Sequence, residues 1–341
     1  SPIASVGPNV GAYTDSTVTG GQSYYYRIGV LRNGEELISD ESTELAANFT
    51  LVSGSEDNTL KKIDSSDGTE IWKFSGHTDR VRAVGVDLDG NVYSGSDDNT
   101  VRKIDPNGNE IWSFSGNTSF IRVVVIDSNG NVYSGSNDGI VRKIDPNGNE
   151  ITSGNWPFTK HSYRAYSIAF DSNGYVYSGA GDGKVKKIDP SDGSEIWSFN
   201  EHTDHVMGVA VDSNGNVYSA SRDYTLKKID PNGNEITSGN WPFTAYENWV
   251  SGVVVDSNDN IYTASNDETV KKIDPSGNEK WSFTGHQIYN RVNCVAVDLF
   301  GNVYSGSHDN TVRKIDPDGN EVWTFNGHTD YVWDVAVNVD Y

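Results

Sequence analysis

Short apolar runs recur along most of this chain, and clusters of turn-forming residues separate them. The stretch 81–117 holds four such runs, at 81–86, 92–96, 101–105 and 110–114. Two-residue alternation, as at Trp112 and Phe114, is typical of half-buried β-strands. Between the runs lie turns such as 87–91, in which Gly90 is free to adopt a positive φ. The pattern predicts four short strands and no helix in this stretch.

The same pattern returns from one end of the chain to the other. Its most constant part is a Lys-Ile-Asp tripeptide that ends at Asp64, Asp105, Asp145, Asp189, Asp230, Asp274 and Asp316. The intervals are 41, 40, 44, 41, 44 and 42 residues. A fixed period near 40 with four strands in each copy predicts the blades of a β-propeller.

Two copies carry the same four-residue insertion before a tryptophan, at 151–159 and 236–244. The insertions account for both 44-residue intervals, and they indicate duplication of a two-blade unit.

The two ends of the repeat region predict how the ring closes. The first copy, 49–76, lacks the innermost strand, and the chain finishes with a spare one, 332–339. If the spare strand joins the first blade, the exposed sheet edges of an open array disappear. We therefore expect an all-β fold in which residues 49–341 form a seven-bladed β-propeller closed by the C-terminal strand.

Residues 1–48 lie outside the repeat and predict a small β segment. The runs 13–18, 20–30 and 39–42 resemble the C-terminal half of a fibronectin type III domain, whose first strands are missing. The segment is then a fragment of something longer, or another surface completes it. A strand pair packed on the propeller is the alternative.

The repeats themselves resemble two related propeller families. Gly-His-Thr-Asp at 76–79 and Ser-Gly-Ser-Asp-Asp-Asn-Thr-Val at 94–101 resemble the WD-repeat, although Ile-Asp at 104–105 replaces its Trp-Asp dipeptide. Residues 92–96 and 105–112 are similar to the blades of quinoprotein-like (PQQ-like) propellers. The resemblance covers all seven copies and implies the fold, but not a function, because propellers host many unrelated functions.

Comparison of the copies separates repeated positions from variable ones. One turn position holds His77, Asn117, His161, His202, Tyr246, His286 and His328. The WD-repeat resemblance implies that these histidines are hydrogen-bonded to the Asp of the following tight turn and to a strand Ser. One outer-strand position holds Trp72, Trp112, Trp156, Trp197, Trp241, Trp281 and Trp323, which we interpret as packing residues.

The variable positions cluster where each innermost strand begins and in the neighbouring tight turn. We call the large or charged residues at these positions the rim: Arg80, Arg82, Phe120, Arg122, Arg164, Tyr166, His205, Arg222, Trp249, Arg291, Tyr331 and Trp333. Arginine and large aromatic residues dominate binding hot spots. The rim is therefore a candidate binding surface, and unconstrained drift is the alternative. Three other arginines alternate with lysine at one strand position, which predicts a solvated strand edge: Arg102, Arg142 and Arg313.

Composition narrows the possible partners. The formal net charge of −22 argues against nucleic-acid binding over the whole surface. No apolar run is long enough to predict membrane insertion. The single Cys294 aligns with a buried strand position, which predicts an inert thiol and leaves no disulfide within the chain.

The sequence predicts no catalytic or metal chemistry. The Asp-rich turns lack the spacing of a calcium-binding EF-hand, and Asn-Gly hairpin turns account for them without metal. We find no hydrolase, metalloprotease or phosphate-loop motif. The resemblance implies that quinoprotein dehydrogenases have a vicinal disulfide, which one cysteine cannot form. We therefore expect no cofactor, no metal and no enzymatic activity.

These observations favour a non-catalytic recognition or structural module, extracellular or on a virion surface as in a tail fibre, and part of a larger assembly. Its rim would bind an anionic glycan or an acidic protein. An intracellular protein-interaction scaffold is the first alternative. A propeller enzyme, either a lyase or lactonase or a quinoprotein-like enzyme, is the second.

Overall fold

The computed structural model describes residues 29–32, 35–38, 50–287 and 290–338. The chain divides into two units, residues 1–47 and 48–341. In the first unit, β1 (Gly29–Arg32) pairs with β2 (Glu35–Ile38) in antiparallel orientation. Most of the segment that resembles a fibronectin type III domain lies outside the described residues.

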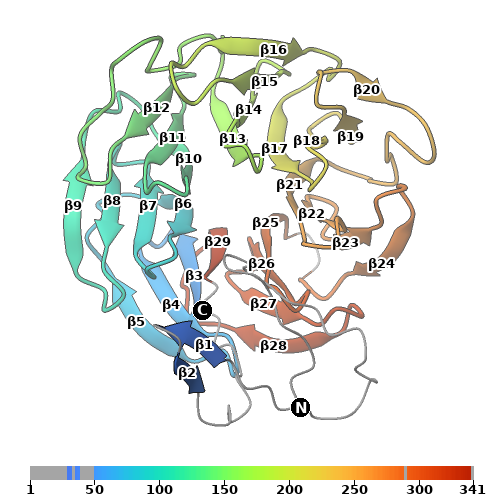
Figure 1. Cartoon of the computed structure of the whole chain (residues 1–341). Helices are drawn as coiled ribbons and strands as arrows, with labels where there is room; N and C mark the ends of the chain where they lie inside the picture. The colour runs from blue at the N-terminus through green and yellow to red at the C-terminus, as the bar shows by residue number, and fades with distance from the viewer. Residues whose placement is uncertain (1–28, 33–34, 39–49, 288–289, 339–341) are drawn as a thin grey trace. The chain divides into compact units, whose positions relative to one another are not determined.

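The second unit is a ring of seven antiparallel sheets around a common axis, which confirms the expected propeller (Figure 1). No helix occurs among the described residues. The innermost strands are β6 (Val81–Val86), β10 (Ile121–Ile126), β13 (Ala165–Phe170), β17 (Val206–Val211), β21 (Val250–Val255), β25 (Val292–Val297) and β29 (Val332–Asn338). The second strands are β3 (Thr50–Ser55), β7 (Val92–Ser96), β11 (Val132–Ser136), β14 (Val176–Ala180), β18 (Val217–Ser221), β22 (Ile261–Ser265) and β26 (Val303–Ser307).

Each blade continues outward from these two strands. The third strands are β4 (Leu60–Asp64), β8 (Val101–Ile104), β12 (Val141–Ile144), β15 (Val185–Ile188), β19 (Leu226–Ile229), β23 (Val270–Ile273) and β27 (Val312–Ile315). The outer strands are β5 (Glu70–Phe74), β9 (Glu110–Phe114), β16 (Glu195–Phe199), β20 (Glu235–Ile236), β24 (Glu279–Phe283) and β28 (Glu321–Phe325). We number the blades one to seven in the order of their second strands.

The C-terminal strand closes the ring as expected. β29 is the innermost strand of blade 1, where Val332 lies opposite Ser55 and Asn338 lies opposite Thr50. The sheet order β29-β3-β4-β5 therefore joins the two ends of the repeat region in one blade.

The apolar cores lie between the blades. One core joins Val52 and Leu60 of blade 1 to Val81 and Val84 of blade 2, and six further clusters repeat the arrangement around the ring. A fully buried Val or Leu side chain contributes about 1.5–3 kcal/mol. Because each blade supplies one wall of two cores, it depends on both of its neighbours.

The two insertions replace most of an outer strand. In blade 3, Phe158 forms an isolated bridge with Val141, and no fourth strand is present among the described residues. In blade 5, β20 has two residues and Phe243 bridges Leu226. Both phenylalanines are buried, so the insertions loop outward and then return to the core.

The repeated tryptophans do more than fill space, because most of them hydrogen-bond to the next blade. The Trp72 indole N–H donates to the Pro106 carbonyl over 2.9 Å. Equivalent bonds run from Trp112 to Pro146, Trp197 to Pro231, Trp241 to Pro275, Trp281 to Pro317 and Trp323 to Ser65. The last bond crosses the closure from blade 7 to blade 1.

The repeated histidines are structural, as the WD-repeat resemblance implies. In blade 2, His77 Nδ1 lies 2.8 Å from Asp98 and Nε2 lies 2.7 Å from Ser94 Oγ. The same arrangement holds for His161, His202, His286 and His328. Burial alone would raise the pKa of Asp98, but the hydrogen bonds from His77 and Thr100 hold that pKa well below its usual range.

Blade 3 departs from this network because Asn117 stands at the histidine position. Its side-chain oxygen accepts from Arg142 over 3.2 Å. Its amide nitrogen and the Ser134 hydroxyl, both buried, have no partner among the described residues. In blade 6 a paired change avoids this defect, since the Tyr246 hydroxyl lies 2.7 Å from Thr263 Oγ1.

One inner-strand position carries an unexpected carboxyl group. Asp334 on β29 lies opposite Gly54, where the other blades place small or apolar residues such as Ala83 or Cys294. Its two oxygens accept backbone N–H bonds from Val84, 2.9 Å away in blade 2, and from Val335 at 3.0 Å. The residue retains some accessible surface, but both oxygens face backbone, and burial raises the pKa of Asp334 to about 7. Cys294, as expected, is buried, and burial raises the pKa of its thiol.

We expect Asn117→His to stabilise the propeller, because an imidazole there would reach Ser134 and Asp138. A net gain of about 1 kcal/mol is typical of one added hydrogen bond. Thermal and urea unfolding of both proteins would measure it. The reverse exchange, His161→Asn in blade 4, should destabilise by a similar amount. An unchanged or lower midpoint for Asn117→His would contradict this interpretation of blade 3.

We expect Asp334→Ser to alter how stability depends on pH. Between about pH 4 and pH 7 the folded carboxyl is protonated while the unfolded one is ionised, so the natural protein loses stability as pH rises. The difference between the two proteins should change by up to about 1.4 kcal/mol per pH unit and level off above pH 7. Serine keeps an acceptor for Val84, as Ser167 does for Val209 at the equivalent position.

Urea unfolding at a series of pH values would measure this difference. Asp318→Ser, in an exposed turn, is the control for loss of one surface carboxylate. A difference between the natural protein and Asp334→Ser that stays constant with pH would show that Asp334 titrates as an ordinary surface group.

Candidate functional site

The backbone of each blade fixes the place of its rim residues. The turn between the second and third strands is hydrogen-bonded to the residue that enters the inner strand, as in Asp97 N–H to the Arg80 carbonyl at 2.9 Å. All seven blades repeat this bond. Each inner strand that carries Arg82 or an equivalent residue also shifts its register by one residue there. Such a bulge re-aims the side chain at that point.

Rim side chains contact one another between blades 1 and 2. The Arg82 guanidinium lies 4.2 Å from the centre of the Trp333 ring. The Trp333 indole N–H donates to Glu56 over 3.0 Å, and the other oxygen of Glu56 pairs with Arg80 at 2.7 Å. Arg82 Nε also donates to both oxygens of Asp97.

Similar contacts continue around blades 4 to 7. Tyr166 stacks on His205 with 5.7 Å between ring centres. Trp249 lies between two arginines, with Arg222 at 4.2 Å and Arg291 at 5.3 Å from the ring centre.

The circuit returns to blade 1 through His308, a turn residue of blade 7. His308 stacks on Tyr331 with ring centres 3.9 Å apart and nearly parallel planes, and it meets Trp333 edge-on at 5.2 Å. The structure therefore brings rim side chains of blades 1, 2 and 4 to 7 into contact with rim residues of neighbouring blades. Much of the aromatic surface that the sequence offered for stacking on a ligand is covered by other rim residues.

The rim arginines differ in their electrostatic partners. Arg80 and Arg82 pair with Glu56 and Asp97. The other four form no ion pair with any described carboxylate: Arg122, Arg164, Arg222 and Arg291. Arg122 donates to the Asn137 amide oxygen over 2.7 Å, and Arg164 approaches the Tyr166 hydroxyl at 3.4 Å.

The three arginines outside the rim behave differently from the prediction. They are not solvated edges, because each pairs with a neighbouring carboxylate: Arg102 with Glu110, Arg142 with Asp138 and Glu150, and Arg313 with Glu321. The Arg142 side chain is only 6% exposed. Cross-strand ion pairing at half-buried positions explains why a cation recurs there in every blade.

The charge states of the rim follow from burial and from the arginines. Burial, together with Arg82 and Arg164, lowers the pKa of Arg122 to about 10, so its guanidinium is charged at neutral pH. Burial and Arg291 lower the pKa of His308 to about 4, and burial and Arg222 lower the pKa of His205. Both histidines are therefore neutral at pH 7, and the positive charge of the rim comes from arginine.

One further aromatic residue of this surface was not predicted by comparing the repeats. Tyr163 is 42% exposed, packs at a tilt against His205 and lies beside Arg164. A Cβ atom on Gly181 would come within 2.3 Å of the Tyr163 ring, so this glycine makes room for it. The signal in the sequence was a glycine at a turn position where the other blades carry polar or charged side chains. Phe120, at 40%, and Tyr331, at 37%, are the other well exposed aromatic residues of the rim.

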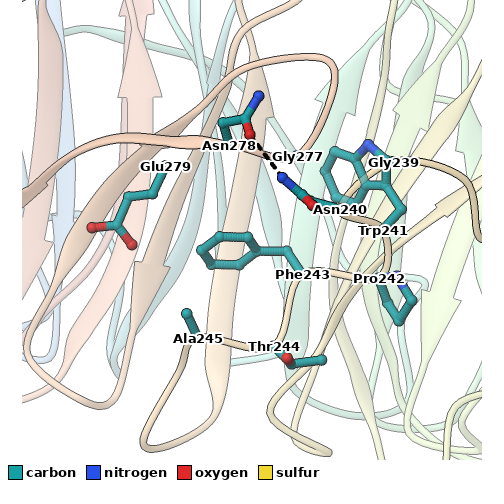
Figure 2. A pocket seen from close by; sticks show the side chains of 10 residues that line it. All are labelled: Gly239, Asn240, Trp241, Pro242, Phe243, Thr244, Ala245, Gly277, Asn278 and Glu279. Carbon is teal, nitrogen blue, oxygen red and sulfur yellow. Dashed lines mark hydrogen bonds between the residues drawn. The ribbon is translucent and has the colours of Figure 1, made fainter.

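A second candidate is a hollow of about 580 Å³ beside the blade 5 insertion (Figure 2). Trp241 and Phe243, which line it, are buried in the core. The Asn240 amide donates to Asn278 over 2.7 Å, and Glu279 pairs with Lys271. These polar side chains are thus already bonded to other residues of the protein, which leaves few polar groups in the hollow for a ligand.

The carboxylates of the Asp-rich turns also accept hydrogen bonds from groups within the protein. Asp87 accepts bonds from the backbone of Asp89, from the backbone and amide of Asn91, and from the buried Tyr93 hydroxyl. Among the described ranges, no group of three or more His, Cys, Asp or Glu residues is arranged to hold a metal ion. The described part of the chain also has no helix that could cross a membrane.

Comparison with known proteins gives one match. The family model PQQ_2, described as outer membrane protein assembly factor BamB, matches residues 38–180 and again residues 181–330. The two matches together span most of the chain. No curated protein matches it significantly.

Proposed function

This chain belongs to the PQQ_2 family of propellers. Because a propeller fold does not determine which ligand is bound, we propose a function on the basis of the rim residues. The protein is a non-catalytic recognition module that binds an anionic partner there. An anionic glycan and an acidic protein segment are the two partner classes that carry the required charge.

One contrast between the arginines carries this proposal. At the third-strand position, Arg102, Arg142 and Arg313 each have a carboxylate partner. At the rim, four arginines have none among the described residues, although the whole chain has a net charge of −22. Unneutralised arginines gathered at one place in an acidic protein favour an anion from outside the chain.

Packing among the rim residues also suits recognition. Arg222 and Arg291 lie against Trp249, and Arg82 lies against Trp333. These contacts hold the guanidinium groups in place before a ligand arrives. Less side-chain entropy is then lost on binding than with free arginines.

Recognition accounts for the rim better than catalysis does. Two of the acidic groups at the rim, Glu56 and Asp97, are each bound to an arginine. The rings of His205 and His308 are packed on tyrosine rings. The matching family model is described as an outer membrane protein assembly factor.

We also propose that the protein works outside a cell or on a virus particle, as part of a larger assembly. The support is the resemblance of residues 1–48 to half of a fibronectin type III domain. Detection of the chain in the secreted or particle fraction of its source would test this. Recovery only from the cytosol would favour an intracellular scaffold instead.

We expect the variant Arg122/Arg164/Arg222/Arg291→Gln to lose anion binding. A library of acidic glycans and acidic peptides, tested at about 50 and 300 mM salt, should bind the natural protein more weakly at high salt. The variant should lose at least about tenfold in affinity, since one charge-assisted hydrogen bond contributes about 1.5–3 kcal/mol.

The matched control is Arg102/Arg142/Arg313/Lys280→Gln, which removes the same charge away from the rim. Thermal unfolding would show that both variants are folded. An equal loss of affinity in the rim variant and in the control would show that the effect comes from net charge alone. If the rim variant keeps full affinity for every anionic ligand that binds, the rim is not the binding surface.

A further inference from the structure

We infer that the partner presents a short acidic peptide segment with two carboxylates to the rim, rather than an extended polyanion. The inference rests on the proposed function and specifies its ligand. It follows from where the negative charges lie, from which aromatic faces are open, and from how the unpaired arginines are distributed.

Carboxylates stand immediately before three rim residues, one of which is an arginine. Asp79, Asp204 and Asp330 each precede a rim residue and accept the backbone N–H of that residue. Asp79 and Asp204 are exposed. A sulfated polysaccharide or a nucleic acid lying across this face would meet these carboxylates and the field of an acidic protein. A short segment whose charge is compact can reach the arginines with less repulsion.

The aromatic residues offer little open surface for a sugar ring. Arg222 and Arg291 lie against Trp249, Arg82 lies against Trp333, and His308 covers one face of Tyr331. The exposed rings of Phe120, Tyr163 and Tyr331 belong to blades 3, 4 and 1, and no contact joins them among the described residues. The rim therefore presents guanidinium groups rather than a stacking platform.

The unpaired arginines form two groups. Arg122 lies on β10 of blade 3, and Arg164 immediately precedes β13 of the neighbouring blade 4. Arg164 is near enough to contribute to the lowered pKa of Arg122, after burial and Arg82. Arg222 and Arg291 flank Trp249 on blades 5 to 7. A guanidinium fork matches a carboxylate in shape and charge. Each of the two groups therefore fits one carboxylate of the partner.

The test uses a fluorescein-labelled flexible peptide with two adjacent glutamates, its glutamine counterpart, and labelled oligomers of an acidic glycan. Binding to the full chain is followed by fluorescence anisotropy. We expect the glutamate peptide to bind at least tenfold more tightly than both other probes. Arg122→Gln and Arg222→Gln should each weaken it about tenfold, as expected for one charge-assisted bond. Arg102→Gln, folded to the same melting temperature, should not.

Each other outcome is informative. If the glycan binds as tightly as the peptide, or alone, and the rim substitutions weaken it, the peptide inference is overturned while the proposed anion-binding function stands. If the glutamine peptide binds equally well, carboxylates are not what is recognised, and the inference fails. If no probe binds, or binding is indifferent to the rim substitutions, both the inference and the proposed function fail.

Discussion

The pairing of β29 with β3 is the constraint on which the rest of the structure depends. Every apolar core lies between two blades, so an open row of seven blades would leave two core walls exposed to water. The pairing removes them by building blade 1 from both ends of the repeat region. The bonds from His328 to Ser53 and Asp57, and from Trp323 to Ser65, cross the same junction. Closure is thus secured by backbone, polar and aromatic contacts together.

A closed ring also explains the rim. Its residues come from positions that no core needs, and they are brought together only because seven inner strands meet around one axis. Once adjacent, arginine and aromatic side chains pack on one another, so Trp249 supports two guanidinium groups instead of facing solvent. Two of the arginines are neutralised within the protein by Glu56 and Asp97. The charge available to a partner is therefore uneven around the ring, and it is greatest on the blades that lack such carboxylates.

Much of this fold was predictable from the sequence, because each repeated residue serves the same contact in every blade. The period, the spare strand 332–339 and the histidine position led to the seven blades, the closure and the hydrogen bonds of His77. The repeat pattern could not predict the role of a residue that occurs in one blade only. Asp334 stands where other copies have small residues, and its bond to Val84 depends on a neighbouring blade.

The rim shows the same limit. The rim residues were recognisable in the sequence as variable positions. The contacts that they make with one another were not, because a residue such as Arg82 meets Trp333 from the far end of the sequence. The contribution of Tyr163 depends on the space left by Gly181.

The closing blade also brings the two ends of the propeller together. β29 starts at Val332, beside the rim, and finishes at Asn338, opposite Thr50, where β3 begins. The first and the last described residues of the propeller therefore lie side by side, at the end of one strand pair in blade 1 and away from the rim.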